Sequence, residues 1–142
     1  MSCMLRASGD DFDVDAFLAS CELEPIAVYH RGEPRFPASQ PEGPRNSRSG
    51  VNFEASGADF SELALQMEEA LAFLRENEPF LARLRDCPGV EVLVLDFGAE
   101  IHPPGWCSFN FRSELLLAMG ALGISLELSV YPVEERADAE LS

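Results

Sequence analysis

Residues 113–131, SELLLAMGALGISLELSVY, decide the fold, because they combine a helical segment, a glycine stop and an alternating strand. Every second residue of that strand is apolar, as in a strand with one buried face and one wet face. The buried face is predicted to hold Ile124, Leu126, Leu128 and Val130, and the wet face Ser125, Glu127, Ser129 and Tyr131. The segment therefore predicts a helix that leads into the half-covered strand of a sheet.

A weaker copy of this helix-turn-strand pattern lies 99 positions earlier in the chain. Similar residues recur at that offset, and an apolar strand follows in both places. The matched pairs are Phe17 with Leu116, Leu18 with Leu117, Ala19 with Ala118, and Leu23 with Leu122. The repetition predicts an internal duplication of a helix-turn-strand unit, with the helices on one face of the sheet and the other face open.

Periodicity and turn residues predict the remaining elements. Asp13 and Asp59 are the expected N-caps of two helices, the second with Glu62 as its capping-box partner. Most connections are too short for parallel crossovers without a helix, so we expect one α+β domain over 1–132, followed by an acidic tail over 133–142. Its mostly antiparallel sheet of about six strands should have helices packed on one face. The predicted strands are 3–8, 26–30, 51–55, 90–97, 106–111 and 124–131, and the predicted helices are 14–21, 60–76, 78–85 and the first part of 113–131.

Residues 31–50, RGEPRFPASQPEGPRNSRSG, interrupt this pattern with four prolines, four arginines and only two glutamates. Their polarity predicts an extended surface loop. Four arginines against two glutamates give the segment a local charge of +2. A second interpretation is therefore a basic flap laid over an acidic body, or an arm that contacts a partner.

The 142 residues carry a formal net charge of −15, from 25 acidic and 10 basic residues, and every basic residue is an arginine. Such a surface repels nucleic-acid phosphates and anionic membranes, so we expect neither as a partner. A basic protein is its natural complement, and charge that serves only solubility is the alternative. No stretch approaches the roughly 20 apolar residues of a membrane span. The N-terminus lacks the features of a signal peptide, so we expect a cytoplasmic protein.

Metal and cofactor sites are not predicted. Asp11, Asp13, Asp15 and Glu22 have the spacing of a calcium loop, but Ala16 stands where such a loop needs glycine. Acidic residues at a helix N-terminus explain the same pattern. Two histidines cannot form a multi-histidine site. Four irregularly spaced cysteines favour reduced thiols over a disulfide framework or a zinc site.

Acid-base chemistry has one weak candidate site, at Asp96, Glu100 and His102. Two carboxylates and an imidazole at a strand end could transfer protons. Asp96 is equally well explained as a turn residue, and His102 as part of an exposed loop before two prolines. No catalytic set is assembled in the sequence, which favours a protein that is not an enzyme.

A partner-binding patch is predicted on the wet side of the sheet. Trp106 and Asn110 alternate outward in the strand 106–111, and an aromatic side chain on a polar face often anchors an interface. A tryptophan that covers the sheet edge is the alternative. The complete candidate patch is Glu54, Trp106, Asn110, Glu127, Ser129 and Tyr131.

Residues 7–35, ASGDDFDVDAFLASCELEPIAVYHRGEPR, resemble the start of a bacterial family known only as domain of unknown function 4279. The similar features are Gly9-Asp10, Leu23-Glu24-Pro25, Arg31-Gly32-Glu33 and the closing unit with Leu122-Gly123-Ile124 before a strand ending at Tyr131. The resemblance covers most of residues 4–132. It implies a small bacterial protein and transfers no activity or catalytic residue.

These observations favour a non-enzymatic protein-binding module, most concretely an immunity protein that neutralises a basic toxin or effector. The analogy rests on size and charge. A small ligand-binding domain or enzyme, with a site near Asp96, Glu100 and His102 or beneath 31–50, is the alternative. A homodimer through the open face or an edge strand is a third interpretation.

Overall fold

A computed structural model describes residues 2–102 and 107–133. Within these residues the element order is β-α-β-β-β-β-α-α-β-α-β. The strands are β1 (Cys3–Gly9), β2 (Ala27–Tyr29), β3 (Pro34–Phe36), β4 (Gln40–Arg45), β5 (Ser49–Ser56), β6 (Val92–Ile101) and β7 (Ser125–Pro132). The helices are α1 (Val14–Leu18), α2 (Leu63–Glu76), α3 (Glu78–Arg85) and α4 (Ser113–Ala121).

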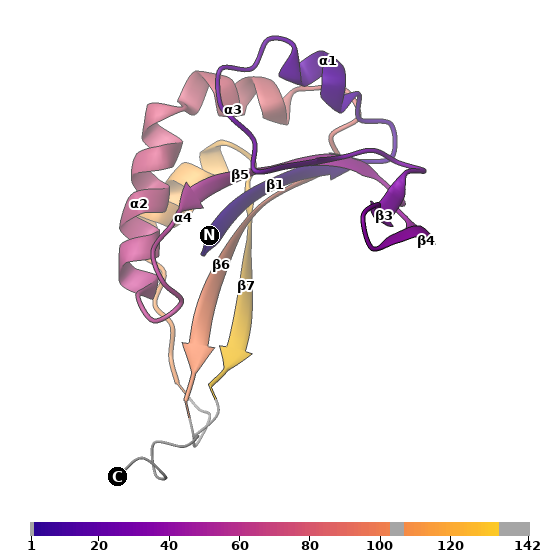
Figure 1. The fold of residues 1–142 in the computed structure, drawn as a ribbon. Helices are drawn as coiled ribbons and strands as arrows, with labels where there is room; N and C mark the ends of the chain where they lie inside the picture. The colour runs from indigo at the N-terminus through magenta and orange to yellow at the C-terminus, as the bar shows by residue number, and fades with distance from the viewer. Residues whose placement is uncertain (1, 103–106, 134–142) are drawn as a thin grey trace, which may run out of the picture.

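Five of the strands form a curved sheet in the order β2-β5-β1-β6-β7, and β3 pairs with β4 in a separate hairpin. Neighbouring strands of the sheet are antiparallel except β6 and β7, which α4 connects as a parallel pair. The helices lie on one side of the sheet, and the hairpin projects from the other side near one end (Figure 1). The predicted α+β fold, with a mostly antiparallel sheet and helices on one face, is confirmed.

The core lies between the helices and the three central strands. Helix α2 contributes Leu74 to it and α3 contributes Leu81 and Leu84, all fully buried. The ring of Phe80 packs 5.3 Å from that of Phe53 and 5.4 Å from that of Phe17, measured between centroids. Each large side chain buried in this way contributes roughly 1.5–3 kcal/mol. The strand residues facing the helices are Cys3, Leu5 and Ala7, then Val51, Phe53 and Ala55, then Leu93, Leu95 and Phe97.

The prediction of an extended loop over 31–50 is wrong, because the segment forms the β3–β4 hairpin and enters β5 at Ser49. Proline is tolerated there because each strand of a two-stranded hairpin is an edge strand. On its outer side a backbone N–H would have no partner strand, so its loss in proline costs no hydrogen bond. The backbone N–H of Gly32 donates to the carbonyl of Asn46, and the N–H of Asn46 donates to that of Glu33, both at 2.9 Å. These bonds hold the base of the hairpin closed.

The final strand is less covered than its alternation predicts. Ile124 is buried, but Leu126 and Val130 are each 38% exposed. The reason is topological: β7 is an edge strand with one neighbour, so the helix layer covers its face only in part. The alternation itself is correct, since the register pairs Leu126 with buried Leu95 on the helix side.

Two other predictions fail locally. Residues 107–111 form no strand, so the predicted strand 106–111 is wrong over its described part, and Trp106 lies outside the described residues. Helix α2 begins at Leu63 instead of Phe60, and the expected capping box is not formed. The carboxylate of Asp59 instead accepts a hydrogen bond from the backbone N–H of Phe60, at 2.6 Å. Phe60 lies outside the helix, and its ring stacks on that of Tyr131.

The two units matched by the sequence repeat both end in edge strands, at opposite edges of the sheet. They differ in size, since α1 and β2 have 5 and 3 residues while α4 and β7 have 9 and 8. They also differ in pairing, because β2 is antiparallel to β5 whereas β7 is parallel to β6.

Candidate functional site

The face of the sheet opposite the helices, called here the open face, carries the second set of alternating residues. Its β6–β7 end is acidic, with Glu100 and Glu127, and its other end is basic, with Arg6 on β1 and the arginines of 31–50. The register places on this face Ala27 and Tyr29, Asn52 and Glu54, Met4, Arg6 and Ser8, Val94, Asp96 and Glu100, and Glu127, Ser129 and Tyr131.

Asp96 is the centre of the open face. Only 5% of this residue is exposed, and both of its carboxylate oxygens have partners. One Nη of Arg6 lies 2.9 Å from one oxygen, and the Ser129 hydroxyl donates to the other at 2.7 Å. A buried carboxylate is stable only when it is paired in this way. The network joins β1, β6 and β7. Burial, and after it the negative charge of Asp96, raises the pKa of the nearby Cys3 thiol.

An aromatic pair closes the acidic end of the open face. Tyr131 stacks on Phe60, with ring centroids 4.6 Å apart and an interplanar angle of 21°. The Phe60 ring lies directly over Gly98, where an added Cβ would come within 2.4 Å of it. Glycine at position 98 therefore makes room for the ring, and the pair leaves Tyr131 46% exposed.

The structure brings together four of the six residues of the predicted patch. Glu54, Glu127, Ser129 and Tyr131 share the open face. Asn110 does not, because it lines a hollow with Ser61, Leu63 and Met67 on the helix side. Its neighbour Phe111 packs edge-on against the core residue Phe97, 5.3 Å between centroids. Trp106 lies outside the described residues.

The three residues of the weak acid-base site do not form one contact group. The imidazole of His102 pairs with the carboxylate of Glu100, with Nε2 and Oε2 3.2 Å apart. Asp96 is instead committed to Arg6 and Ser129. The Glu100–His102 pair lies at the far end of β6, and 64% of the His102 side chain is exposed.

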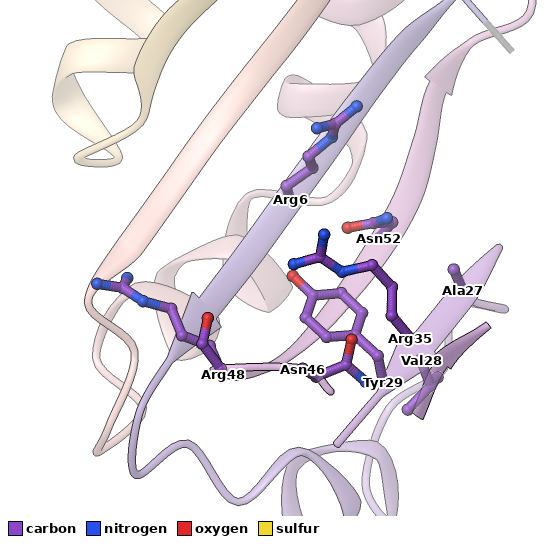
Figure 2. Close-up of a pocket in the computed structure, with 9 residues that line it drawn as sticks. Arg6, Ala27, Val28, Tyr29, Arg35, Asn46, Arg48 and Asn52 are labelled. Atoms are coloured by element: carbon purple, nitrogen blue, oxygen red, sulfur yellow. The ribbon is translucent and has the colours of Figure 1, made fainter. Parts of the chain in front are cut away.

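A hollow of about 510 Å³ lies at the basic end of the open face and is called here the arginine hollow. It is formed where the loop that follows the β3–β4 hairpin passes the sheet, so that its lining comes from several segments (Figure 2). Among the described residues, three arginines and no acidic side chain contribute to the lining. The residues are Arg6, Ala27, Val28, Tyr29, Arg35, Asn46, Ser47, Arg48 and Asn52.

The polar groups of the arginine hollow are incompletely paired. Arg48 is only loosely paired, with atoms 3.5 Å from Asp10 and 4.0 Å from Glu91. Arg35 makes no hydrogen bond or ion pair with any described residue. The side-chain oxygen of Asn52 is buried and also lacks a partner among them. Guanidinium groups in such a setting attract an anion, and a buried acceptor needs a donor.

A glycine determines the wall of this hollow. At Gly50 an added Cβ would lie 2.3 Å from the ring and hydroxyl of Tyr29, and 2.8 Å from the carbonyl oxygen of Ala7. Tyr29 therefore lies flat over β5 at this position. A larger residue at position 50 would displace the Tyr29 ring and change the shape of the hollow.

Comparison of the chain with protein-family models, curated proteins and solved structures finds no match. The family resemblance therefore stays a prediction. Among the described residues no three His, Cys, Asp or Glu side chains are placed to hold a metal ion, and no described helix is long and apolar enough to cross a membrane.

The sequence suggested a ligand site beneath 31–50 as an alternative, and the arginine hollow lies beside this segment, but the residues that line the hollow were not predicted. Arg35 and Arg48 belong to that segment, but Arg6 and Asn52 come from strands whose neighbours only the fold reveals. The prediction of Asp13 as a helix N-cap is confirmed, since its side chain accepts a hydrogen bond from the Ala16 N–H at 3.1 Å.

His30 connects the base of the hairpin to α1. Its two ring nitrogens each lie 3.0 Å from a carboxylate oxygen, one of Asp15 and one of Glu33. The hydrogen bond to Asp15, followed by the charges of both carboxylates, raises the pKa of His30 above 6.5. The protonated form is therefore favoured in the folded state.

Stability should fall as the pH rises through the folded pKa of His30. Because that pKa is raised, the stabilisation is fully present below the unfolded value of about 6.5 and disappears above the folded one. Exposed ion pairs are weak, so the change should stay below about 1 kcal/mol. Urea unfolding of wild type and His30→Gln between pH 5.5 and 8.5 measures it. An identical pH profile in the two proteins would contradict the assignment.

Proposed function

We propose that the protein is a non-enzymatic binding module whose open face receives a basic protein. Support comes above all from one observation: no helix of the described residues covers the open face (Figure 1), and the strand register places mostly polar and charged residues on it. Glu127 is exposed there, and Tyr131, four residues further along β7, is 46% exposed. Aromatic rings surrounded by polar groups are frequent interface anchors.

Charge gives this proposal its direction. A protein with a net charge of −15 attracts a basic partner over long distances and speeds their encounter. The acidic end of the open face, at β6 and β7, then meets the basic surface. The most concrete version is an immunity protein that occludes the active site of a basic toxin.

The first test is the salt dependence of binding. The immobilised chain is exposed to host proteins at low ionic strength, and each retained protein is identified and purified for affinity measurements. We expect a basic partner whose Kd weakens by at least about tenfold between about 50 and 300 mM salt, because salt screens the attraction. If it is a toxin, adding the chain should abolish its activity.

A charge reversal locates the contact. Glu127→Lys on the open face should weaken Kd by about tenfold or more, whereas Glu68→Lys on α2 should leave it within about twofold. Both glutamates are exposed, so the pair differs mainly in the face that is changed. Equal losses in the two variants, or a partner bound only through the helix side, would contradict the proposal.

A further inference from the structure

We propose that the arginine hollow binds a small organic anion, a phosphate or carboxylate joined to a flat ring that carries a hydrogen-bond donor. Nucleoside monophosphates are the simplest probes of this class. The inference does not depend on the protein partner proposed above. It rests on the charge, the hydrogen-bonding groups and the shape of the hollow.

The charge of the hollow selects an anion. Arg6, Arg35 and Arg48 all line it, and no acidic side chain of residues 2–102 or 107–133 does. Two of them have acidic neighbours outside the lining, with Asp96 on Arg6 and Asp10 and Glu91 on Arg48. Arg35 has no partner among the described residues. Its five N–H donors make no hydrogen bond within the described part of the chain and can therefore bind a phosphate or a carboxylate, which a guanidinium holds through two parallel hydrogen bonds.

The other groups select what the anion is attached to. Tyr29 presents an aromatic ring, and Ala27 and Val28 add an apolar border on the same strand. Figure 2 shows Arg6, Arg35, Tyr29 and Asn52 around one space. The buried side-chain oxygen of Asn52 lacks a donor, so a ligand with an N–H or O–H group would satisfy it. An anion on a donor-bearing ring combines all three requirements.

The size of the hollow fits this class. Its volume of about 510 Å³ lies within the roughly 300–1,000 Å³ of small-molecule sites. A bare inorganic ion would fill a small part of that space and would leave Tyr29 and Asn52 unused. The ligand is therefore expected to gain affinity from its ring as well as from its charge.

Isothermal titration calorimetry on the full chain tests the proposal with the four common nucleoside monophosphates, their parent nucleosides and inorganic phosphate. At least one monophosphate should bind with a Kd below about 100 μM. Its nucleoside and inorganic phosphate should each bind at least about tenfold more weakly, since hydrogen bonds to a charged group typically contribute a factor of ten or more. No heat from any monophosphate at about 1 mM would overturn the proposal. Equal affinity for inorganic phosphate would overturn it as well.

Two arginine variants locate the site. Arg35→Gln should weaken the monophosphate by about tenfold or more, because it removes the guanidinium that has no other described partner. Arg83→Gln is the matched control, an exposed arginine on α3, and should bind as wild type does. Thermal melting confirms that both variants fold, and Arg48→Gln serves as a second variant of the hollow. Unchanged binding in both Arg35→Gln and Arg48→Gln would refute the assignment.

Discussion

Replacement of Arg6 by methionine is expected to lower the free energy of unfolding by about 2 to 3 kcal/mol. The Asp96 side chain is only 7% exposed, and its ion pair with Arg6 has an N–O distance of 2.9 Å. Without the guanidinium, the carboxylate keeps one hydrogen bond, from Ser129. Breaking a fully buried pair costs about 3–5 kcal/mol. The value expected here is smaller because 45% of the Arg6 side chain is exposed.

The double variant Arg6→Met/Asp96→Leu is the control for this effect. It removes the buried charge together with its partner, so its stability should return to within about 1 kcal/mol of wild type. Urea unfolding of the two variants and of wild type gives the comparison. A single variant as stable as wild type would show that Asp96 does not depend on Arg6. If Arg6→Met/Asp96→Leu is less stable than Arg6→Met, Asp96 likewise does not depend on Arg6.

Replacement of Gln66 by leucine should cost about 2 kcal/mol or more. This side chain of α2 is fully buried and joins the helix to β6. Its amide donates to the carbonyls of Gly98 and Asp59, at 2.7 and 2.9 Å, and its oxygen accepts from the Gly98 N–H at 3.2 Å. The Gly98 N–H and the Asp59 carbonyl keep other backbone partners, so the expected cost is that of three lost hydrogen bonds. Each contributes roughly 0.5–1.5 kcal/mol, and leucine can replace none of them.

Glu68→Leu is the matched control in the same helix, because Glu68 is exposed. Its stability should change by less than about 0.5 kcal/mol. If the two leucine variants unfold at the same urea concentration, Gln66 does not tie α2 to the sheet.

The alternation of apolar residues was sufficient to predict most of the sheet. It identified β5, whose buried residues face the helices, and it assigned Glu127, Ser129 and Tyr131 to the open face. Both strands have the period of two that burial on one face produces. The strand β6 was identified instead by its continuous apolar run, which is typical of a central strand. The exposed edge of β7 could not be predicted, since the strand order determines which strands have only one neighbour.

Local signals were misleading where tertiary contacts competed with them. The prolines of 31–50 led to the prediction of a loop instead of a hairpin. Proline disfavours central strands, but edge strands accept it. Alternation in 106–111 suggested a strand, yet Phe111 packs on Phe97 without strand pairing in the described part of the segment. Phe60 fits a helix by pattern but leaves it to stack on Tyr131.

The site was predictable only in part, because its residues meet through the fold. The net charge of −15 and the polar residues that alternate outward in 124–131 suggested an acidic surface. The first signal comes from composition, and the second from one stretch of sequence. The Arg6–Asp96–Ser129 network joins residues from three strands. Their proximity follows from the strand order, which the sequence pattern does not determine.

Photocross-linking from the open face tests the central claim most directly, that this face is the binding surface. A photoreactive phenylalanine analogue replaces Glu127 on β7 in one protein and Glu68 on α2 in another, and each is irradiated with the partner retained at low salt. The account predicts that only the analogue at position 127 is cross-linked to the partner. Cross-linking from position 68 with none from position 127 would contradict it.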